Sequence, residues 1–534
     1  MSRRVEAATR RPDSGGRSTV FGPKGAVACE HPSAAVIGLR VLDSGGTAAD
    51  ACVAMAAAMV VLSPMQTGMG GDAFLLFYEA ESGQVTGVNG SGRAPAAVDV
   101  EKHVDLDEMP ERGGLTVTVP GAVRLWEDAV NRYGNLALAR LLEPAWELAE
   151  NGYPVAEVVA RYWDEHEDVL RTNEAATRTF LPEDRPPVAG EIFSQVDLAA
   201  TISAVAERGA DAFYKGEIAA SIARSTQEAG GYLSEEDLAA HESTFVEPIS
   251  TDYRGIQVHE IPPPGQGVAA LEMLNILEGF DLASMDPSGA DRIHLEVEAK
   301  KLAFEDLHDR IGDPAHSVIP TEELLSKDYA ARLRASISRD AAAVLSTPDP
   351  WGDTTYLCAV DAEGNGCSFI NSLYRGFGSG IVAEGTGVCL HNRGNSFRLE
   401  SGHPNAIAPG KRPMHTLIPG LATSDGTLWA VFGVMGAAMQ PQGHAQVLVD
   451  LLDYGMDPQE AVEHPRHRHE NGVLLIEGRI PEEEIARLRG RGHRIEVRGD
   501  FMIPAGGAQL IRILDNGVRA CGSDPRKDGC ALAQ

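Results

Sequence analysis

Residues 351–377, WGDTTYLCAVDAEGNGCSFINSLYRGF, contain two mostly apolar runs separated by a short polar turn. The first run follows Asp353 and continues to Val360, a turn-forming stretch occupies 361–365, and a second run over 366–373 leads back. Two such runs joined by a short turn containing Gly and Asn predict a β-hairpin. The hairpin places the hydroxyl of Ser372 on the strand next to the one that Thr354 begins.

Elsewhere the pattern predicts helices and strands in both halves of the chain. The segment ADACVAMAAAMVVL is apolar nearly all round and therefore predicts a fully buried helix. Helices are expected at 47–62, 122–133, 136–150, 197–208, 216–228, 289–311, 321–337, 443–454 and 480–490. Strands are expected at 25–29, 73–78, 85–89, 355–361, 366–372, 428–433, 474–477, 494–497 and 508–513. Periodicity alone indicates a mixed α and β protein.

Length and composition indicate a large globular protein. The chain has 534 residues, of which 43% are hydrophobic and 23% charged, and the length predicts two to four domains. No apolar run approaches the ~18 residues that span a bilayer. Several arginines lie near the N-terminus, but no apolar stretch follows them to make a signal peptide. We therefore expect a cytoplasmic protein whose residues 1–20 form a polar tail.

Charge and cysteine content exclude several classes of function. The net charge of −31 would repel nucleic acid and anionic membranes, so neither is expected as a partner. The seven cysteines are scattered, which indicates reduced, buried residues rather than a disulfide framework. No CxxC pair indicates zinc, and we expect no metal and no cofactor.

The Asp353–Thr354 junction permits one kind of chemistry. A threonine hydroxyl is a weak nucleophile unless a base lies beside it, and its own α-amine can serve as that base. The amine is free only if the chain is cut between Asp353 and Thr354. A free α-amino group titrates near pH 7–8, so it can accept the hydroxyl proton at neutral pH. An acidic residue followed by two threonines is nevertheless ordinary, and the residue types alone do not establish this chemistry.

A family resemblance adds the missing support. The segment DTTYLCAVDAEGNGCSFINSLYRGFGSGIVAEGTGVCLHNR, which begins at Asp353, is similar to the start of the small subunit in the γ-glutamyltransferase (glutathione hydrolase) family. Further matching segments are GGTAADACVA (45–54), QTGMGGDAF (66–74), SGRAP (91–95), PPPGQG (262–267), HLEVEAKKLAFEDLHDRIGDP (294–314), KRPMHTLIP (411–419), GVMGAAMQPQGHAQ (433–446) and GSDPRKDG (522–529). They occur in family order and cover nearly the whole chain after about residue 20.

The resemblance implies an α+β fold, a four-layer α-β-β-α sandwich of the N-terminal-nucleophile (Ntn) hydrolase type. It implies that a precursor cleaves itself into a large subunit region, 21–353, and a small catalytic region, 354–534, which fold together. The two subunits would be partners of one another. Assembly into a homo-oligomer is left open.

The resemblance also assigns the catalytic groups. Thr354 would be the nucleophile and its amine the general base, with Thr355 as the rival nucleophile. Ser372 matches a hydroxyl that hydrogen-bonds the nucleophile. Two backbone N–H groups, of Gly436 and Ala437, would stabilise the oxyanion. Ala437 stands where the family has glycine, and its N–H survives the change provided that its φ is negative.

The groups that would hold a substrate carboxylate are mostly retained. Arg93 matches the arginine that grips the α-carboxylate, a task suited to a guanidinium. Thr416 keeps one of two adjacent hydroxyls, and His415 occupies the position of the other.

The groups that would hold the γ-glutamyl ammonium are altered. Tyr374 replaces an asparagine, Ser396 replaces the aspartate that pairs with the ammonium, and Arg393 replaces a glutamine. Losing an acid and gaining a cation disfavours an ammonium by a few kcal/mol. The pocket thus resembles the oxamate-amidase-like and cephalosporin-acylase-like members. Alternatively, Arg393 points to solvent and another residue takes the ammonium.

These observations predict an autoprocessing amidohydrolase that cleaves small-molecule amides through a threonine acyl-enzyme. Its acyl group would be anionic and lack a free α-amine. One alternative is a γ-glutamyltransferase or glutathione hydrolase acting on γ-glutamyl amides. An alternative of another class is an uncleaved, non-catalytic ligand-binding homologue.

Two further segments carry weaker signals. Residues 463–470, EHPRHRHE, fit no strong zinc template, and we expect a surface or subunit-contact loop there. Residues 68–72, GMGGD, resemble a phosphate-binding loop only loosely, and tight packing near the active site explains their glycines better.

Overall fold

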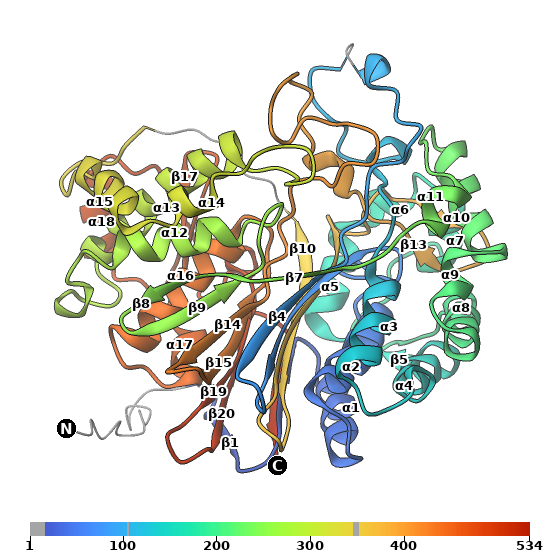
Figure 1. The fold of residues 1–534 in the computed structure, drawn as a ribbon, viewed down its shortest axis with the longest axis horizontal. Helices are drawn as coiled ribbons and strands as arrows, with labels where there is room; N and C mark the ends of the chain where they lie inside the picture. Colours follow the sequence, from blue (N-terminus) through green and yellow to red (C-terminus); the bar gives the residue numbers. More distant parts are fainter. Residues whose placement is uncertain (1–15, 104–105, 345–351) are drawn as a thin grey trace.

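The computed structural model describes residues 16–103, 106–344 and 352–534. Two seven-stranded antiparallel sheets lie face to face at its centre (Figure 1). The β10 sheet has the order β21 (Cys530–Ala533), β2 (Ala26–Cys29), β10 (Asp353–Val360), β11 (Gly366–Tyr374), β3 (Asp72–Glu79), β4 (Gln84–Asn89) and β7 (Thr244–Val246). The β15 sheet has the order β1 (Val20–Gly22), β20 (Arg519–Ser523), β19 (Ala508–Ile513), β15 (Thr427–Val434), β14 (Gly420–Ser424), β9 (Ile256–Glu260) and β8 (Ile249–Tyr253).

Strands from both sides of the expected cut share the β10 sheet. The predicted hairpin is β10 and β11, which pair antiparallel in the middle of the sheet. β10 also pairs with β2, and β11 with β3, both from the N-terminal half. Alternate residues of β10 face opposite sides, as a strand requires: Leu357 packs toward the helices, whereas Tyr356 packs against the β15 sheet beside Val431.

Helices cover the outer faces of both sheets (Figure 1). Those over the β10 sheet are α1 (Pro32–Asp43), α2 (Ala48–Leu62), α3 (Ala122–Tyr133), α4 (Leu138–Asn151), α5 (Glu157–Glu165), α6 (Glu167–Leu170), α7 (Glu174–Phe180), α8 (Val196–Arg208), α9 (Asp211–Tyr214), α10 (Glu217–Glu228) and α11 (Glu235–Ala239). Those over the β15 sheet include α12 (Gly267–Leu277), α13 (Ala290–Arg310), α14 (Thr321–Leu324), α15 (Lys327–Ser336), α16 (Met439–Leu452) and α17 (Pro458–Glu463).

The helix predicted to be fully buried is α2. All of its residues are buried, and Thr47 begins it with a capping box: the Thr47 hydroxyl accepts a bond from the backbone N–H of Asp50, and the Asp50 carboxylate accepts one from the backbone N–H of Thr47. A helix that is apolar all round is stable only when other elements surround it. The prediction for 47–62 is confirmed.

Two local predictions were wrong. Residues 463–470 are not a surface loop: β16 (His467–Glu470) is buried and pairs with β17 (Val473–Glu477), which in turn pairs with β18 (Ile495–Arg498). The helix expected over 321–337 is divided into α14 and α15. Ser326 separates them because its hydroxyl accepts a bond from the backbone N–H of Tyr329 and so caps α15.

The described part of the expected N-terminal tail is fastened to the body of the protein. Arg17 donates a hydrogen bond from its guanidinium to the Gly529 carbonyl, and the Thr19 hydroxyl donates one to Asp457. Val20 already belongs to β1. The expected tail therefore does not extend to residue 20, and residues 1–15 lie outside the described residues.

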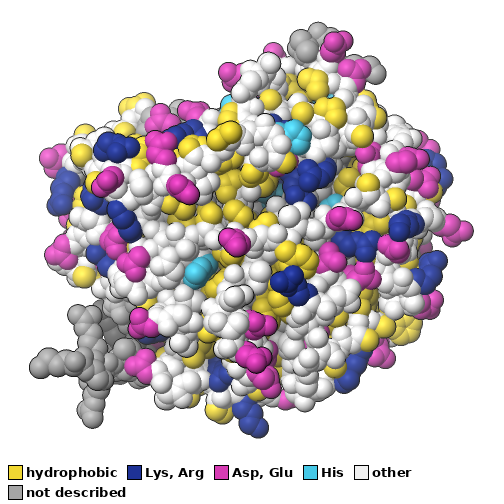
Figure 2. Space-filling view, in the orientation of Figure 1, with side chains coloured by type: hydrophobic (Ala, Val, Ile, Leu, Met, Phe, Trp, Pro, Cys, Tyr) yellow, Lys and Arg dark blue, Asp and Glu magenta, His cyan; other side chains and the backbone are white. Residues whose placement is uncertain are grey.

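The surface carries charges of both signs. On the face shown in Figure 2, acidic side chains are spread among basic ones rather than gathered in one patch. The cysteines are all free, and all but Cys530 are buried, which confirms the prediction of reduced, buried residues. Of the helices in the described part of the chain, none combines the length and the apolar character needed to cross a bilayer.

The loop between β15 and α16 contains an unusual backbone conformation. Ala437 has a φ of +51° and Gly436 a φ of +124°. The condition of a negative φ at Ala437 is therefore not met. A side chain in the left-handed region costs roughly 1–2 kcal/mol, because its Cβ approaches the following carbonyl oxygen. The loop is held in a conformation that glycine would adopt more easily.

We expect Ala437→Gly to stabilise the protein by about 0.5 kcal/mol. The left-handed strain is relieved, and the greater freedom of glycine in the unfolded chain, roughly 0.5–1 kcal/mol, offsets only part of that gain. Urea unfolding midpoints measure the difference. Ala445→Gly, inside α16, is the matched control and should destabilise by about 1 kcal/mol. Equal destabilisation by both variants would contradict the expected strain at Ala437.

Several histidines are buried in their neutral form. Burial lowers the pKa of His467, His493 and His415 to about 3 in each case. In the unfolded chain a histidine has a pKa near 6.5. The unfolded state therefore binds protons that the folded state excludes, so stability from these groups is complete above about pH 6.5 and decreases as the pH falls toward the folded pKa.

We accordingly expect the urea unfolding midpoint to fall between about pH 6.5 and pH 4. The measurement is made at high salt, so that general charge repulsion is screened. Glu296 works in the other direction, because burial raises its pKa to about 7, and burial also raises the pKa of Glu260 and Glu272. Further histidines add to the expected fall, because burial lowers the pKa of His31, His241 and His259 to about 4. A midpoint that stays constant or rises on acidification would contradict the buried neutral state of these histidines.

Candidate active site

A bulge in the central hairpin brings together the Thr354 and Ser372 hydroxyls, which are predicted to act together. Asp353 pairs with Tyr374 and Thr355 with Asn371, so Thr354 lies opposite both Ser372 and Leu373. Bulges re-aim side chains near functional sites. Here the Thr354 hydroxyl donates a hydrogen bond of 3.1 Å to the Ser372 hydroxyl, which also accepts one of 2.8 Å from the backbone N–H of Tyr374. Both hydroxyl residues are buried.

The rival nucleophile lies in a different environment. Thr355 is fully buried, and within the described residues its hydroxyl has no hydrogen-bond partner. Thr354, in contrast, has Ser372 on its hydroxyl and the side-chain amide of Gln66 donating to its carbonyl at 3.3 Å. These contacts favour Thr354. The structure describes an uncut strand, so the nitrogen of Thr354 is an amide within β10.

The loop of Gly436 and Ala437 lies beside the start of β10. A Cβ placed on Gly352 would lie 3.1 Å from the Cβ of Ala437 and 2.5 Å from the carbonyl oxygen of Tyr374. The chain just before the expected cut thus passes between Tyr374 and the loop predicted to hold the oxyanion. The same crowding explains the 68–72 segment, where a Cβ on Gly71 would lie 2.4 Å from the Ser372 carbonyl oxygen.

Arg393 is buried and incompletely paired. It is fully inaccessible to solvent, donates one hydrogen bond of 2.9 Å from Nη1 to the Thr416 hydroxyl, and lies 4.0 Å from the centre of the Tyr374 ring. Within the described residues, its Nε and Nη2 have no hydrogen-bond partner. Burial lowers the pKa of the guanidinium to about 10, which leaves it protonated at neutral pH. Arg393 therefore does not point to solvent.

Both ring nitrogens of His415 are hydrogen-bonded within the protein. Its Nε2 lies 3.0 Å from Oδ2 of Asp72, and its Nδ1 accepts a bond from the backbone N–H of Leu417. Its ring packs on Phe74, with centroids 4.6 Å apart. Burial lowers its pKa, as given above, so the ring is neutral and donates from Nε2 to the carboxylate. Neither nitrogen is left for a substrate.

Asp72 organises the interior behind the predicted pocket. Its Oδ2 lies 3.2 Å from Nδ1 of His391 as well as 3.0 Å from His415, and all three side chains are fully buried. Burial alone would raise the pKa of Asp72, but the two imidazoles outweigh it and hold the pKa below its usual range. Asp72 is also the register partner of Ser372 across β3 and β11. It thus links the nucleophile strand to the loop of His415.

Arg93 is not part of this buried group. Its side chain is 44% exposed, donates to the Gly410 carbonyl at 3.0 Å, and lies 3.8 Å from Asp313. Its placement in the carboxylate grip rests on the family resemblance and remains a prediction. Of the residues predicted to bind substrate, the structure brings Tyr374, Arg393 and Thr416 into direct contact.

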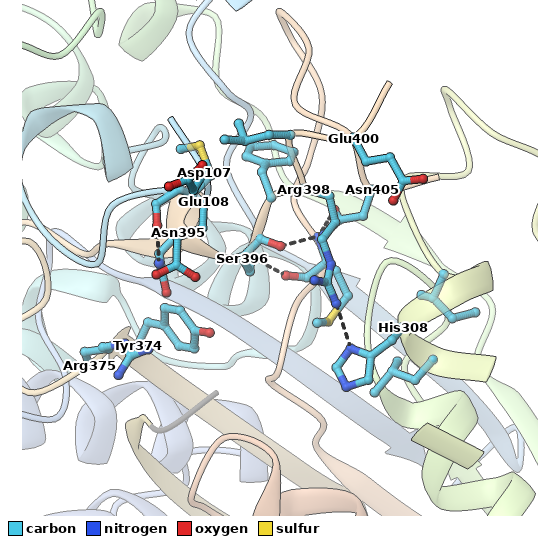
Figure 3. Close-up of a pocket in the computed structure, with 16 residues that line it drawn as sticks. Asp107, Glu108, His308, Tyr374, Arg375, Asn395, Ser396, Arg398, Glu400 and Asn405 are labelled. Carbon is cyan, nitrogen blue, oxygen red and sulfur yellow. Dashed lines mark hydrogen bonds between the residues drawn. The ribbon is translucent and has the colours of Figure 1, made fainter. Parts of the chain in front are cut away.

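A cavity of about 420 Å³ opens beside this group. Figure 3 shows Tyr374 and Arg375 on one side of it, Arg398 and His308 on the other, and Ser396 between them. The hydroxyl of Ser396 is bonded to the carbonyls of Arg393 and Met414. Further lining residues include Asp107, Glu108, Asn395, Glu400 and Asn405. A cavity of this size accommodates a small-molecule substrate.

Sequence reasoning missed three residues that support the site. Gln66 and Gln266 lie inside the matching segments QTGMGGDAF and PPPGQG. A glutamine amide is neither a nucleophile nor an acid or base, so the residue type does not indicate a role in catalysis. Asp72 ends the glycine-rich segment, and its role appears only when His391 and His415 approach from more than 300 residues away. The signal that could have identified them was their position within the family segments.

One group of residues resembles a metal-ligand set. Ligand atoms of His294, Glu298 and His493 lie within 4.8 Å of one another. However, both Glu298 oxygens already accept hydrogen bonds, from the Lys301 ammonium at 2.6 Å and from the backbone N–H of Ala343 at 3.0 Å. The two imidazoles are bonded to each other at 2.8 Å. This cluster fastens the segment that follows α15 to α13.

Comparison with known proteins identifies the family. Residues 34–534 match the family model described as Gamma-glutamyltranspeptidase. The chain is 38% identical over 521 residues to the glutathione hydrolase-like YwrD proenzyme of Bacillus subtilis (strain 168), with 96% of this chain and 99% of that protein covered. It is 34% identical over 525 residues to the oxamate amidohydrolase proenzyme of Klebsiella pneumoniae subsp. pneumoniae, with 95% and 98% covered.

A solved structure agrees in fold. The crystal structure of cephalosporin acylase from Bacillus halodurans matches with a TM-score of 0.92 and 41% identity, covering 98% of each chain. Its arrangement corresponds to the two antiparallel sheets and flanking helices described above. The chain therefore belongs to the gamma-glutamyltranspeptidase family of N-terminal-threonine hydrolase proenzymes.

Proposed function

We propose that this enzyme cleaves itself before Thr354 and then hydrolyses small amides whose acyl group carries an anion and lacks a free α-amine. The observation that carries the proposal is the buried, incompletely paired guanidinium of Arg393. Removing a charge from water without a partner is costly. A carboxylate or a second carbonyl on the acyl group would supply the missing acceptors for Nε and Nη2.

The same pocket is unfavourable for a γ-glutamyl ammonium. Ser396 replaces the family's aspartate, and its hydroxyl donates to the backbone carbonyls of Arg393 and Met414. The nearest buried acid on the His415 side, Asp72, is already hydrogen-bonded to His415 and lies 3.2 Å from Nδ1 of His391. A substrate ammonium beside Arg393 would therefore meet a like charge with no acid to offset it. Oxamate-type and glutaryl-type acyl groups avoid that repulsion.

The chemistry would proceed in two stages. In the first, the Thr354 hydroxyl attacks the carbonyl carbon of Asp353, the peptide C–N bond breaks as an ester forms, and water then hydrolyses the ester to leave a free α-amine on Thr354. In the second, that amine takes the hydroxyl proton as the oxygen attacks the substrate amide, and it passes the proton to the leaving nitrogen as the amide C–N bond breaks and an ester to Thr354 forms. The N–H groups of Gly436 and Ala437 would stabilise the oxyanion, and water would release the acid.

The fold and the division of the chain follow from the same proposal. We assign the two facing sheets and their helices to the four-layer α-β-β-α sandwich of Ntn hydrolases. Residues 21–353 would form the large subunit and 354–534 the small one, and β10 would remain paired with β2 of the large subunit after cleavage.

A γ-glutamyl hydrolase is the second candidate function. It is supported by the similarity to the glutathione hydrolase-like YwrD proenzyme and by Thr416, which retains a hydroxyl for a substrate carboxylate. In that case Arg393 would hold the α-carboxylate and the ammonium would turn into the cavity, toward Asn395 or Glu108.

Thr354→Ala should abolish self-cleavage. The purified variant should remain one chain of 56.8 kDa, because the attacking hydroxyl is absent, whereas the wild-type protein should give two fragments, the smaller starting at Thr354. Intact-mass spectrometry makes the measurement. Thr355→Ala is the matched control and should still cleave, since its hydroxyl has no partner in the described structure. A wild-type protein that stays intact would instead support a non-catalytic binding homologue.

Arg393→Gln should lower kcat/KM for glutaryl-p-nitroanilide by about 10- to 100-fold, the usual loss when a charge-assisted hydrogen bond is removed. The wild-type enzyme should prefer this substrate to γ-glutamyl-p-nitroanilide. The double variant Arg393→Gln, Ser396→Asp should shift the preference toward the γ-glutamyl compound. Arg124→Gln, on α3, serves as the control. Wild-type preference for γ-glutamyl-p-nitroanilide would rule out the anionic-acyl proposal.

A further inference from the structure

Gln266 lies at the junction of two loops that the proposed function uses. It directly precedes α12, after the turn at 262–265, and its side chain is almost completely buried. Its amide nitrogen donates a hydrogen bond of 2.6 Å to the Thr416 carbonyl and one of 2.8 Å to the Ala437 carbonyl. A primary amide has two N–H donors, and each of them is used.

The two acceptors belong to different parts of the site. Thr416 accepts the hydrogen bond from Arg393 with its hydroxyl, so its loop carries the anion-binding group. Ala437 lies in the loop predicted to hold the oxyanion. One buried amide group thus bridges the end of the pocket that would bind the acyl anion and the end where the reacting carbonyl would lie.

Gln266 itself is fixed by its backbone. Its N–H donates to the His415 carbonyl at 3.0 Å, and the N–H of His415 donates to the Pro264 carbonyl at 2.8 Å. The side chain therefore extends from a rigid base. Its bond to Ala437 holds the carbonyl of a residue whose φ is +51°. The bond therefore restrains the loop that carries the Ala437 N–H.

We propose that Gln266 is a positioning residue that keeps the oxyanion loop at a fixed distance from the Arg393–Thr416 pair. The proposal rests on the proposed function and adds a residue to it. A substrate held by its anionic end presents its carbonyl to the N–H donors only if that separation is correct. Displacements of about 1 Å at a catalytic site can cost about 100-fold in rate, so this bridge should affect the chemical step more than substrate binding.

The test uses the matured enzyme, with the N-terminus at Thr354 verified by mass spectrometry, and an anilide that the wild-type enzyme hydrolyses. Gln266→Met keeps the length of the side chain and removes both donors. We expect kcat to fall about 10- to 100-fold while KM changes less than about threefold, because the transition state loses alignment and the Arg393 contact persists.

Gln459→Met is the matched control. Gln459, on α17, is also buried and also donates two hydrogen bonds, to the Ser523 carbonyl at 2.8 Å and to Glu463 at 3.0 Å. It belongs to no part of the site. Its loss should lower the unfolding midpoint and leave kcat within about twofold of wild type. A role of Gln266 in stability alone would make the two variants behave alike.

Gln266→Glu gives a second readout should the methionine variant fold poorly. An ionised carboxylate repels both carbonyls, whereas a protonated one donates a single hydrogen bond. Relative to wild type, the kcat of this variant should therefore rise as the pH is lowered. A Gln266→Met kcat within twofold of wild type, or equal pH profiles for Gln266→Glu and wild type, would overturn the inference. A wild-type enzyme that neither cleaves itself nor hydrolyses any amide would overturn the proposed function, and this inference with it.

Discussion

The pairing of β10 with β11 and β2 is the interaction on which the rest of the structure depends. β10 is a central strand: β11 pairs with it along nearly its whole length, and β2 pairs with its second half, from Leu357 to Val360. Its position is therefore maintained by the sheet rather than by the peptide bond that precedes Thr354. A chain cut at that bond would gain an amine without releasing the residue that bears it. Central strands suit this purpose, since an edge strand would fray at its new terminus.

Unfavourable backbone geometry gathers around this strand. Tyr374, at the end of β11, has a φ of +79°, and Ala437 has a φ of +51°. Such conformations cost of order 1–3 kcal/mol each and persist only where the surroundings over-determine them. At Tyr374 the guanidinium of Arg393 lies over the ring, and the backbone N–H of Tyr374 donates a hydrogen bond to the Ser372 hydroxyl. At Ala437 the surroundings include the amide of Gln266. The groups that hold the strained residues are thus the same groups that shape the pocket.

The sequence predicted the elements whose signals are local. The hairpin and α2 could be identified because turn residues and apolar spacing act over a few positions. β16 could not, because its histidines and arginine appear polar until Glu296 and the Pro504 carbonyl, both distant in sequence, meet them in the interior. The positive φ of Ala437 depends on tertiary contacts and cannot be predicted from the residue type. The same holds for the direction of Arg393, which depends on where Thr416 and Tyr374 lie.

The altered pocket can be understood as one coordinated change. At position 415, where the family resemblance places a hydroxyl that would hold substrate, the histidine has both nitrogens hydrogen-bonded, to Asp72 and to a backbone N–H. Arg393 adds donors close to the place where that hydroxyl is lost, and Thr416 orients it. Loss of the aspartate at position 396 removes the acid that would otherwise neutralise this guanidinium. The cavity also has three acids in its lining, and Figure 3 shows Asp107 and Glu108 on the side of Tyr374 and Glu400 on the side of Arg398. The buried guanidinium of Arg393 keeps two nitrogens without partners among the described residues, and the proposed preference for an anionic acyl group rests on them.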